Sequence, residues 1–257
     1  MLRISPIEAF SDNYIWLIQR ESDNRAFVVD PGDPAVVEQA LESAGLELAG
    51  ILITHHHFDH VGGLQALKAA HQPVVYGPAN PGIEGLDHTV SNGDVVDVLG
   101  VDFRVMEVPG HTLDHIAYFA SAPSPVLFCG DTLFAGGCGR VFEGTFEMMH
   151  ASLQVLMELP ETTRVYCAHE YTLANLAFAQ AVEPDNQALA RRINDAEASR
   201  ARGEPTVPST LGLELDTNPF VRCETEALQA SLRSQERLES SDPAAVFATV
   251  RGWKDTF

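Results

Sequence analysis

Four histidines and one aspartate fall within residues 54–60, in the segment Thr-His-His-His-Phe-Asp-His, directly after an apolar, strand-like run. Side chains alternate along a strand, so His55 and His57 point the same way, and a turn then brings Asp59 and His60 towards the same point. Neutral imidazoles and a carboxylate are good ligands for zinc, iron or manganese. Two glycines and a predicted helix follow. The segment therefore predicts a metal site at a strand end.

Three further candidate ligands also end strand-like runs: His111 in "MEVPGHT", Asp131 in "PVLFCGDT" and His169 in "RVYCAHEY". Taken singly, each is more typical of a structural histidine or a turn-capping aspartate. Strand ends on one edge of a sheet converge, however, so these three groups can meet the first cluster. Seven donors exceed the need of one tetrahedral ion that keeps an open position. They suit two ions about 3.5–4 Å apart that share a carboxylate and hold a bridging hydroxide.

The elements that must position these residues follow from apolar periodicity and turn signals. Strands are predicted at 14–18, 26–30, 50–54, 73–77, 101–110, 115–120 and 125–131, the first being entered through a turn. Helices are predicted at 33–45, 60–71, 173–182, 186–202, 223–237 and 242–253, with a loop-rich connector at 203–220. Asp33 before Pro34 predicts the start of the first helix, and Gly45 its end. The pattern indicates a β-rich α/β domain followed by a smaller helical domain.

Composition narrows the functional class. The chain has 257 residues and a formal net charge of −20, which argues against nucleic acid and against an anionic membrane surface as partners. No apolar run approaches the roughly 18 residues of a membrane span, and the N-terminal segment lacks the order of a signal peptide. The four cysteines (Cys129, Cys138, Cys167, Cys223) show no CxxC spacing, which predicts reduced thiols in a cytoplasmic protein. Nothing in the sequence requires more than a monomer.

The chain resembles the metallo-β-lactamase superfamily in four motifs, which occur in order: THxHxDH at 54–60, GHT at 110–112, GDT at 130–132 and AHE at 168–170. The resemblance implies an αββα sandwich, with two sheets packed face to face and helices outside. It also implies a ligand set for each of two metal ions. His55, His57 and His111 would hold one ion, Asp59, His60 and His169 the other, and Asp131 would bridge them.

Within that superfamily the chain looks like the glyoxalase II (hydroxyacylglutathione hydrolase) family over nearly its whole length. Further matching segments lie at 11–18, 130–145, 169–172, 217–222 and 250–254. The resemblance implies a catalytic domain at 1–172 and a helical, glutathione-binding domain at 173–257. It implies hydrolysis of S-D-lactoylglutathione to D-lactate and glutathione, the second step of methylglyoxal detoxification. It also implies two divalent ions, with Zn²⁺ preferred and iron or manganese acceptable.

The same resemblance implies substrate-binding residues. Glutathione is anionic, so a strongly acidic protein needs a local cationic patch. The positions of Arg140, Arg251 and Lys254 would supply it, and the last two are three residues apart on the final predicted helix, so they share a face. Tyr171 matches a tyrosine that hydrogen-bonds the glutathione backbone. Phe142 stands where some members have a second tyrosine, which puts one substrate hydrogen bond in doubt.

The sequence also suggests roles for residues outside the predicted ligand and substrate-binding sets. Asp114 occupies a position that is often glycine in the family. His56 lies between two ligands and should face away from them, whereas His115 either orients a ligand or fills the core. Surface or structural roles are expected for the remaining histidines, His71, His88 and His150.

In the mechanism this implies, Asp59 and Asp131 act with the metals as catalytic residues, and Asp59 is the best candidate to orient the hydroxide. The ions also stabilise the developing oxyanion. The leaving thiolate is stable, with a pKa near about 8.5 for an ordinary thiol, so a dedicated general acid is not required. No GxSxG segment occurs.

Four alternatives remain for comparison. The first is a persulfide dioxygenase of the same superfamily, which uses a single iron and lacks the long helical tail. A β-lactam hydrolase commonly has cysteine where Asp131 stands and is usually exported. A tRNA-processing nuclease would need a basic surface. A non-catalytic scaffold usually loses ligands, whereas all seven ligand positions are filled here.

Overall fold

The computed structural model of the protein describes residues 2–21 and 23–257. The chain forms two compact units. The first comprises Met1–Glu107 and Asp114–Gly130, and the second comprises Val108–Leu113 and Asp131–Phe257. The predicted domain boundary after residue 172 stays a prediction. No helix in the described part of the chain is long and apolar enough to cross a membrane.

The first unit contains a sheet in the order β1-β2-β3-β4-β5-β6, in which β1, β2 and β3 pair antiparallel and the later neighbours pair parallel. Its strands are β1 (Leu2–Ala9), β2 (Asn13–Arg20), β3 (Arg25–Val29), β4 (Glu47–Leu52), β5 (Val74–Gly77) and β6 (His88–Thr89). The helices of this unit are α1 (Pro34–Ala44), α2 (Phe58–Val61) and α3 (Leu64–His71).

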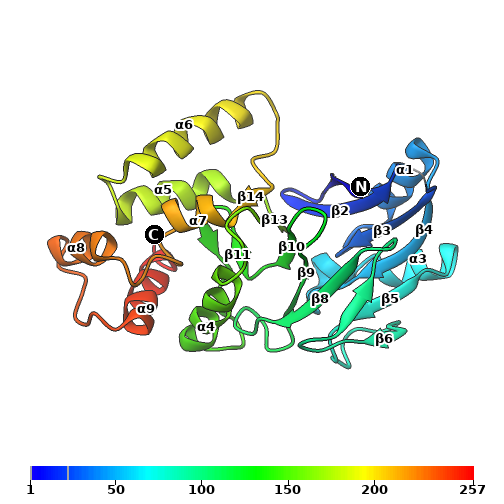
Figure 1. The fold of residues 1–257 in the computed structure, drawn as a ribbon, viewed down its shortest axis with the longest axis horizontal. Helices are drawn as coiled ribbons and strands as arrows, with labels where there is room; N and C mark the ends of the chain where they lie inside the picture. The colour runs from blue at the N-terminus through cyan, green and yellow to red at the C-terminus, as the bar shows by residue number, and fades with distance from the viewer. Residues whose placement is uncertain (1, 22) are drawn as a thin grey trace. The chain divides into compact units, whose positions relative to one another are not determined.

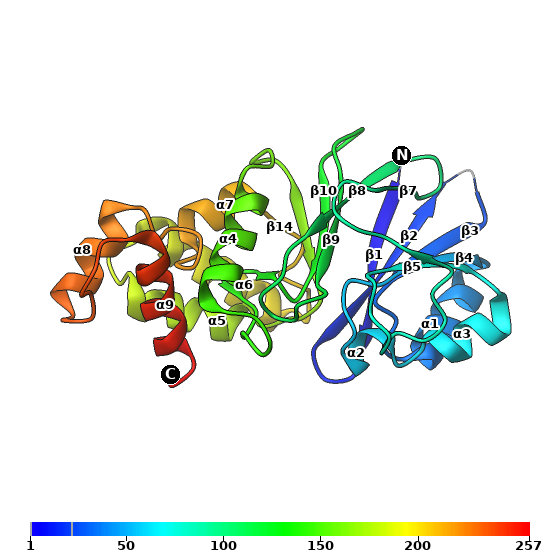
Figure 2. The ribbon, with the colours of Figure 1, turned by 90° about the horizontal axis from the view of Figure 1, so that it is seen from below.

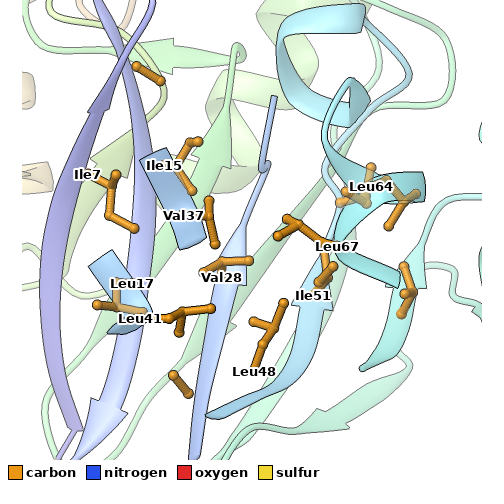
Figure 3. Packing of buried hydrophobic residues seen from close by; sticks show 14 of the residues in the cluster. Ile7, Ile15, Leu17, Val28, Val37, Leu41, Leu48, Ile51, Leu64 and Leu67 are labelled. Atoms are coloured by element: carbon orange, nitrogen blue, oxygen red, sulfur yellow. The ribbon is translucent and has the colours of Figure 1, made fainter. Parts of the chain in front are cut away.

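One face of this sheet packs against α1 and α3. Val37 and Leu41 of α1, with Leu64 and Leu67 of α3, join a buried cluster of aliphatic strand residues (Figure 3). Burial of a Leu or Val side chain contributes about 1.5–3 kcal/mol, so this layer fixes the strand ends firmly. Figure 2 shows α1 and α3 beside β4.

The other face of the sheet is also buried, as Trp16 and Ile18 show at alternate positions of β2. Four antiparallel strands in the order β10-β9-β8-β7 lie against it: β7 (Val95–Asp97), β8 (Asp102–Glu107), β9 (Ile116–Ala120) and β10 (Val126–Gly130). The Tyr118 hydroxyl of β9 crosses between the sheets and donates a hydrogen bond to the Ile53 carbonyl at 2.9 Å. This unit thus contains the predicted face-to-face packing of two sheets.

The second unit is mainly helical, and Figure 1 shows α5 and α6 side by side in it. Its strands are β11 (Leu133–Phe134), β12 (Gly137–Cys138), β13 (Arg164–Cys167) and β14 (Ser209–Thr210). Its helices are α4 (Phe146–Met157), α5 (Thr172–Val182), α6 (Gln187–Ala201), α7 (Leu211–Thr217), α8 (Glu226–Ser234) and α9 (Pro243–Lys254).

Local signals predicted several elements well. The carboxylate of Asp33 caps α1 by accepting a hydrogen bond from Ala35 N at 2.9 Å, and Gly45 ends the helix with a left-handed φ of 63°. The predicted helices at 173–182, 186–202 and 242–253 correspond to α5, α6 and α9. The predicted start and end of α1 are confirmed, because the capping signals of Asp33 and Gly45 act within one helical turn.

Other expectations were wrong. The helix predicted at 60–71 is two helices, because α2 begins at Phe58 and Gly62–Gly63 separate it from α3, so Asp59 and His60 lie within a helical turn. The connector predicted at 203–220 contains α7, which Thr210 caps by accepting from Leu213 N. Helix α4 and strand β1 were not predicted, and β1 forms an antiparallel hairpin with β2, which is the strand predicted at 14–18.

Candidate metal centre

The first unit brings together four of the predicted ligands, at the end of β4 and in α2. His55 Nε2 lies 3.1 Å from His57 Nδ1, and the rings of His55 and His60 have centroids 4.0 Å apart. His60 Nε2 lies 3.4 Å from Asp59 Oδ2. His55 and His60 are buried, whereas the Asp59 side chain is 37% exposed. The alternation of a strand end and one turn of helix therefore points these donors at a common region.

A buried carboxylate that the sequence reasoning missed organises this set. Asp30 accepts hydrogen bonds from Thr54 N at 2.8 Å and Thr54 Oγ1 at 2.7 Å, and its Oδ2 lies 2.9 Å from His60 Nδ1. Thr54 Oγ1 in turn lies 3.0 Å from His55 Nδ1. Asp30 has a left-handed φ of 53°, a conformation that costs energy for most residues and is tolerated best by Asn and Asp. One residue thus orients two candidate ligands. The available signal was its position, since Asp30 also ends a strand-like run.

The second unit brings together the other three predicted ligands. Asp131 Oδ2 lies 3.5 Å from His111 Nε2 and 3.3 Å from His169 Nε2, and all three residues are buried. His111 Nδ1 lies 2.7 Å from the Arg140 carbonyl oxygen, so Nδ1 carries the proton and Nε2 is left to bind an ion. One carboxylate oxygen between two imidazole nitrogens is the arrangement expected of a bridging ligand.

These donors fit a divalent metal. Two ligand atoms on one tetrahedral ion, at bond lengths of about 2.0–2.2 Å, lie about 3.4 Å apart. The separations within each unit, 3.1 Å and 3.4 Å in the first and 3.3 Å and 3.5 Å in the second, are close to that value. The Nδ1 atoms of His60 and His111 face oxygen acceptors, which is the usual outer hydrogen bond of a metal-binding histidine.

Two aromatic side chains pack beside the ligands of the second unit. The Tyr171 ring is stacked on His169 at 4.6 Å with an interplanar angle of 5°, and the Phe142 ring meets His111 edge-on at 5.3 Å. Phe142 is 60% exposed and the guanidinium of Arg140 lies 5.6 Å from its ring centroid. Both predicted substrate-contact aromatics therefore have exposed surface beside a candidate ligand.

The three predicted cations differ in environment. The Arg140 side chain is 64% exposed, whereas that of Arg251 is 6% exposed and donates to the Cys138 carbonyl at 3.2 Å and to Asp255 at 3.1 Å. Lys254 Nζ donates to the Ala174 carbonyl at 3.2 Å. Burial and the nearby Arg251 charge lower the pKa of Lys254. Arg251 thus has a supporting role in holding the chain near Arg140, and its predicted substrate contact stays a prediction.

Two histidines that are not predicted ligands, His115 and His56, lie beside the candidate ligands. His115 is buried and its ring stacks on His55 at 4.6 Å with an interplanar angle of 18°. His56 Nδ1 lies 2.9 Å from Asp114 Oδ1, and Asn80 Nδ2 donates to Asp114 Oδ2 at 2.8 Å. Asp114, unusual for its position, therefore accepts hydrogen bonds that tie His56 to the loop at Asn80.

A cysteine nucleophile is not supported. The four cysteines, all in the described part of the chain, form no disulfide and are buried. Burial raises the pKa of Cys138, and it raises the pKa of Cys167 to about 12. Thiolate is the nucleophilic form, so burial disfavours Cys138 and Cys167 as nucleophiles.

Comparison with family models divides the chain into two matches. Residues 10–169 match the metallo-β-lactamase superfamily, and residues 170–257 match the hydroxyacylglutathione hydrolase C-terminus. Among solved structures, ETHE1 from Myxococcus xanthus is 26% identical with a TM-score of 0.65, covering 100% of this chain and 99% of that one. The BLEG-1 B3 metallo-β-lactamase has a TM-score of 0.64 at 23% identity, covering 86% of this chain and 99% of that one. The predicted α/β fold class, a metallo-β-lactamase sandwich followed by a helical region, is confirmed.

Curated relatives extend the match over the full length. The hydroxyacylglutathione hydrolase of Chromohalobacter salexigens is 51% identical over 257 residues, and that of Pseudomonas putida (strain GB-1) is 53% identical over 260 residues. In both cases all of this chain and all of the relative are covered. The chain belongs to the hydroxyacylglutathione hydrolase family, within the metallo-β-lactamase superfamily.

Proposed function

We propose that the protein hydrolyses S-D-lactoylglutathione to D-lactate and glutathione, using two divalent metal ions held by the donors of both units. The observation that carries the metal assignment is Asp131 Oδ2, which lies within 3.5 Å of one imidazole nitrogen on each side. The reaction class is supported by full-length relatives named hydroxyacylglutathione hydrolase. The same relatives favour this reading over a persulfide dioxygenase.

In this proposal the first ion takes His55, His57 and His111, the second takes Asp59, His60 and His169, and Asp131 is shared. Zn²⁺ suits the imidazole and carboxylate donors, and iron or manganese is an acceptable substitute. A solved structure with a TM-score of 0.60 and 25% identity, TTHA1623, is described in a di-iron-bound form, covering 84% of this chain and 99% of that one. When bound, the ions would activate water as the nucleophile and polarise the thioester carbonyl.

The chain's own residues supply binding and orientation. Asp59 offers a partly exposed carboxylate that accepts a hydrogen bond from the attacking water and fixes its direction. The exposed guanidinium of Arg140 and the ammonium of Lys254 attract the glutathione carboxylates, and Tyr171 offers a hydroxyl to the peptide backbone. The leaving thiol has an ordinary pKa near about 8.5, so it departs as thiolate without a dedicated acid.

The proposal includes a monomer in the cytoplasm. Buried cysteines that form no disulfide are typical of a reducing compartment. Light scattering on the purified protein tests the oligomeric state directly.

The first test measures loss of thioester absorbance from S-D-lactoylglutathione, with metal analysis of the same sample. We expect rapid hydrolysis, about two metal ions per chain, and loss of activity on chelation that Zn²⁺ restores. Arg140→Ala should raise KM more than it lowers kcat, because Arg140 is proposed to bind and not to react. A single iron per chain, with oxygen consumption on glutathione persulfide and no hydrolysis, would overturn the function.

A further inference from the structure

The turn between β1 and β2 approaches α2, although residues 13 and 59 are 46 positions apart in the chain. Asn13 is the first residue of β2 and pairs with Ala9 across the hairpin. It is 7% exposed, and its Nδ2 donates a hydrogen bond to Asp59 Oδ2 at 2.9 Å. A buried amide therefore acts on the carboxylate of a candidate ligand.

The oxygen that accepts this hydrogen bond also lies beside a second candidate ligand. Asp59 Oδ2 is also the atom 3.4 Å from His60 Nε2, the separation expected of two ligand atoms on one metal. The amide thus limits rotation of the carboxylate about its last torsion, which is otherwise broad and roughly two-fold. It also withdraws some charge from Oδ2, which tunes its strength as a ligand.

The backbone beneath the carboxylate is held by a close approach. A Cβ atom at residue 32 would collide with the Asp59 carbonyl oxygen and would lie 2.9 Å from the Phe10 ring. Gly32 therefore lets the hairpin tip, the turn after β3 and α2 come together. The close approach of the main chain and the hydrogen bond to the carboxylate together restrict the orientation of Asp59.

We infer that Asn13 is a positioning residue for Asp59, which selectively maintains the metal ion proposed to bind Asp59, His60 and His169. This inference rests on the proposed two-metal site and deepens it. Asn13 completes a pattern in which outer partners fix the donors: Asp30 for His60, Thr54 for His55 and the Arg140 carbonyl for His111. Asn13 touches no substrate in this account and acts only through Asp59.

The test is a Zn²⁺ titration of the metal-free full-length protein, read by calorimetry and by metal content after gel filtration. Wild type should bind two ions. In Asn13→Ala, the affinity for one ion should fall about 10–100-fold, the usual cost of losing an outer partner, and the other affinity should be unchanged. Asn13→Asp, which has the same shape but places a second carboxylate against Asp59, should lose that ion at least as fully.

Asn175→Ala is the matched control, because Asn175 is also buried and donates its amide to a backbone oxygen, that of Ala135 at 3.3 Å. Thermal unfolding of the metal-free variants, compared with wild type, checks that each one folds. Two unchanged affinities in Asn13→Ala, or an equal fall in both, would overturn the inference while the proposed function stands. A wild-type protein that binds fewer than two ions would overturn the proposed function and this inference with it.

Discussion

Single side chains in both units hold the candidate ligands by hydrogen bonds to buried partners. Asp30 is the most connected of these partners, since it contacts Thr54 twice and His60 once. A buried carboxylate is costly unless its oxygens are paired, and these three contacts satisfy them. The residues that shape the centre are therefore as buried as the core, while the residues proposed to meet substrate, such as Arg140 and Phe142, are exposed.

Phe142 provides a prediction at this scale. Its exposed ring lies against His111 and Arg140, so a tyrosine there would place a hydroxyl in the region proposed for glutathione. We expect Phe142→Tyr to lower KM by about 2–10-fold with little change in kcat, because one added hydrogen bond contributes about 0.5–1.5 kcal/mol. Steady-state kinetics with S-D-lactoylglutathione measures both constants. Phe142→Leu, the control, should raise KM, and an unchanged KM in the tyrosine variant would mean that this position lies outside the substrate site.

At the scale of elements, turns and caps bring distant residues to the centre. The β1–β2 hairpin presents Asn13, β4 ends three residues before the histidine cluster, and α2 contains Asp59 and His60. Helix α9 carries Arg251 and Lys254 in its last turn, where cations interact favourably with the helix dipole. Substrate affinity should therefore depend on how well α9 is formed.

The caps of α1 and α9 allow this to be tested with a matched pair. Both helices begin with the sequence Asp-Pro-Ala, and Asp33 and Asp242 each accept a hydrogen bond from a first-turn backbone N–H, at 2.9 Å and 3.1 Å. Asp33→Ala and Asp242→Ala should each lower the free energy of unfolding by about 1 kcal/mol, measured by urea denaturation. Only Asp242→Ala should also raise KM, because α9 bears the predicted cations. Equal KM values in the two variants would show that α9 does not contribute to substrate binding.

At the scale of the whole molecule, charge opposes the proposed substrate. The formal net charge is −20, and the glutathione thioester is anionic. Long-range repulsion extends over a Debye length, which is about 30 Å at 0.01 M salt and about 8 Å at 0.15 M. Contacts of the substrate with Arg140 and Lys254 act at shorter range, so salt weakens them less than it weakens the long-range repulsion.

Adding salt to a solution of low ionic strength should therefore increase kcat/KM. We expect kcat/KM to rise by a factor of about 2 to 10 between 0.01 M and 0.15 M NaCl, as repulsion during encounter is screened. The dependence should disappear for a thioester whose carboxylates are amidated. A steady fall of kcat/KM with salt would show instead that the local cations dominate the encounter.

The sequence alone determined which groups are available for chemistry and the order in which they occur. Strand-end donors such as His55, His111 and Asp131, and the cap of α1, were readable because period-two alternation and capping act over a few residues. The motifs at 54–60, 110–112, 130–132 and 168–170, with the further matching segments, resemble the superfamily and the family, and the full-length relatives confirmed both.

Only the tertiary structure decided which partners fix the donors. The hydrogen bond from Asn13 to Asp59 and the contact of Asp30 with His60 join residues 46 and 30 positions apart, and no local spacing encodes such contacts. Arg251 and Arg140 carry the same charge in sequence, yet one is buried against Cys138 and the other is exposed. The physical reason is that burial and long-range hydrogen bonding depend on how elements pack, whereas the sequence pattern reports the preferences of each element by itself.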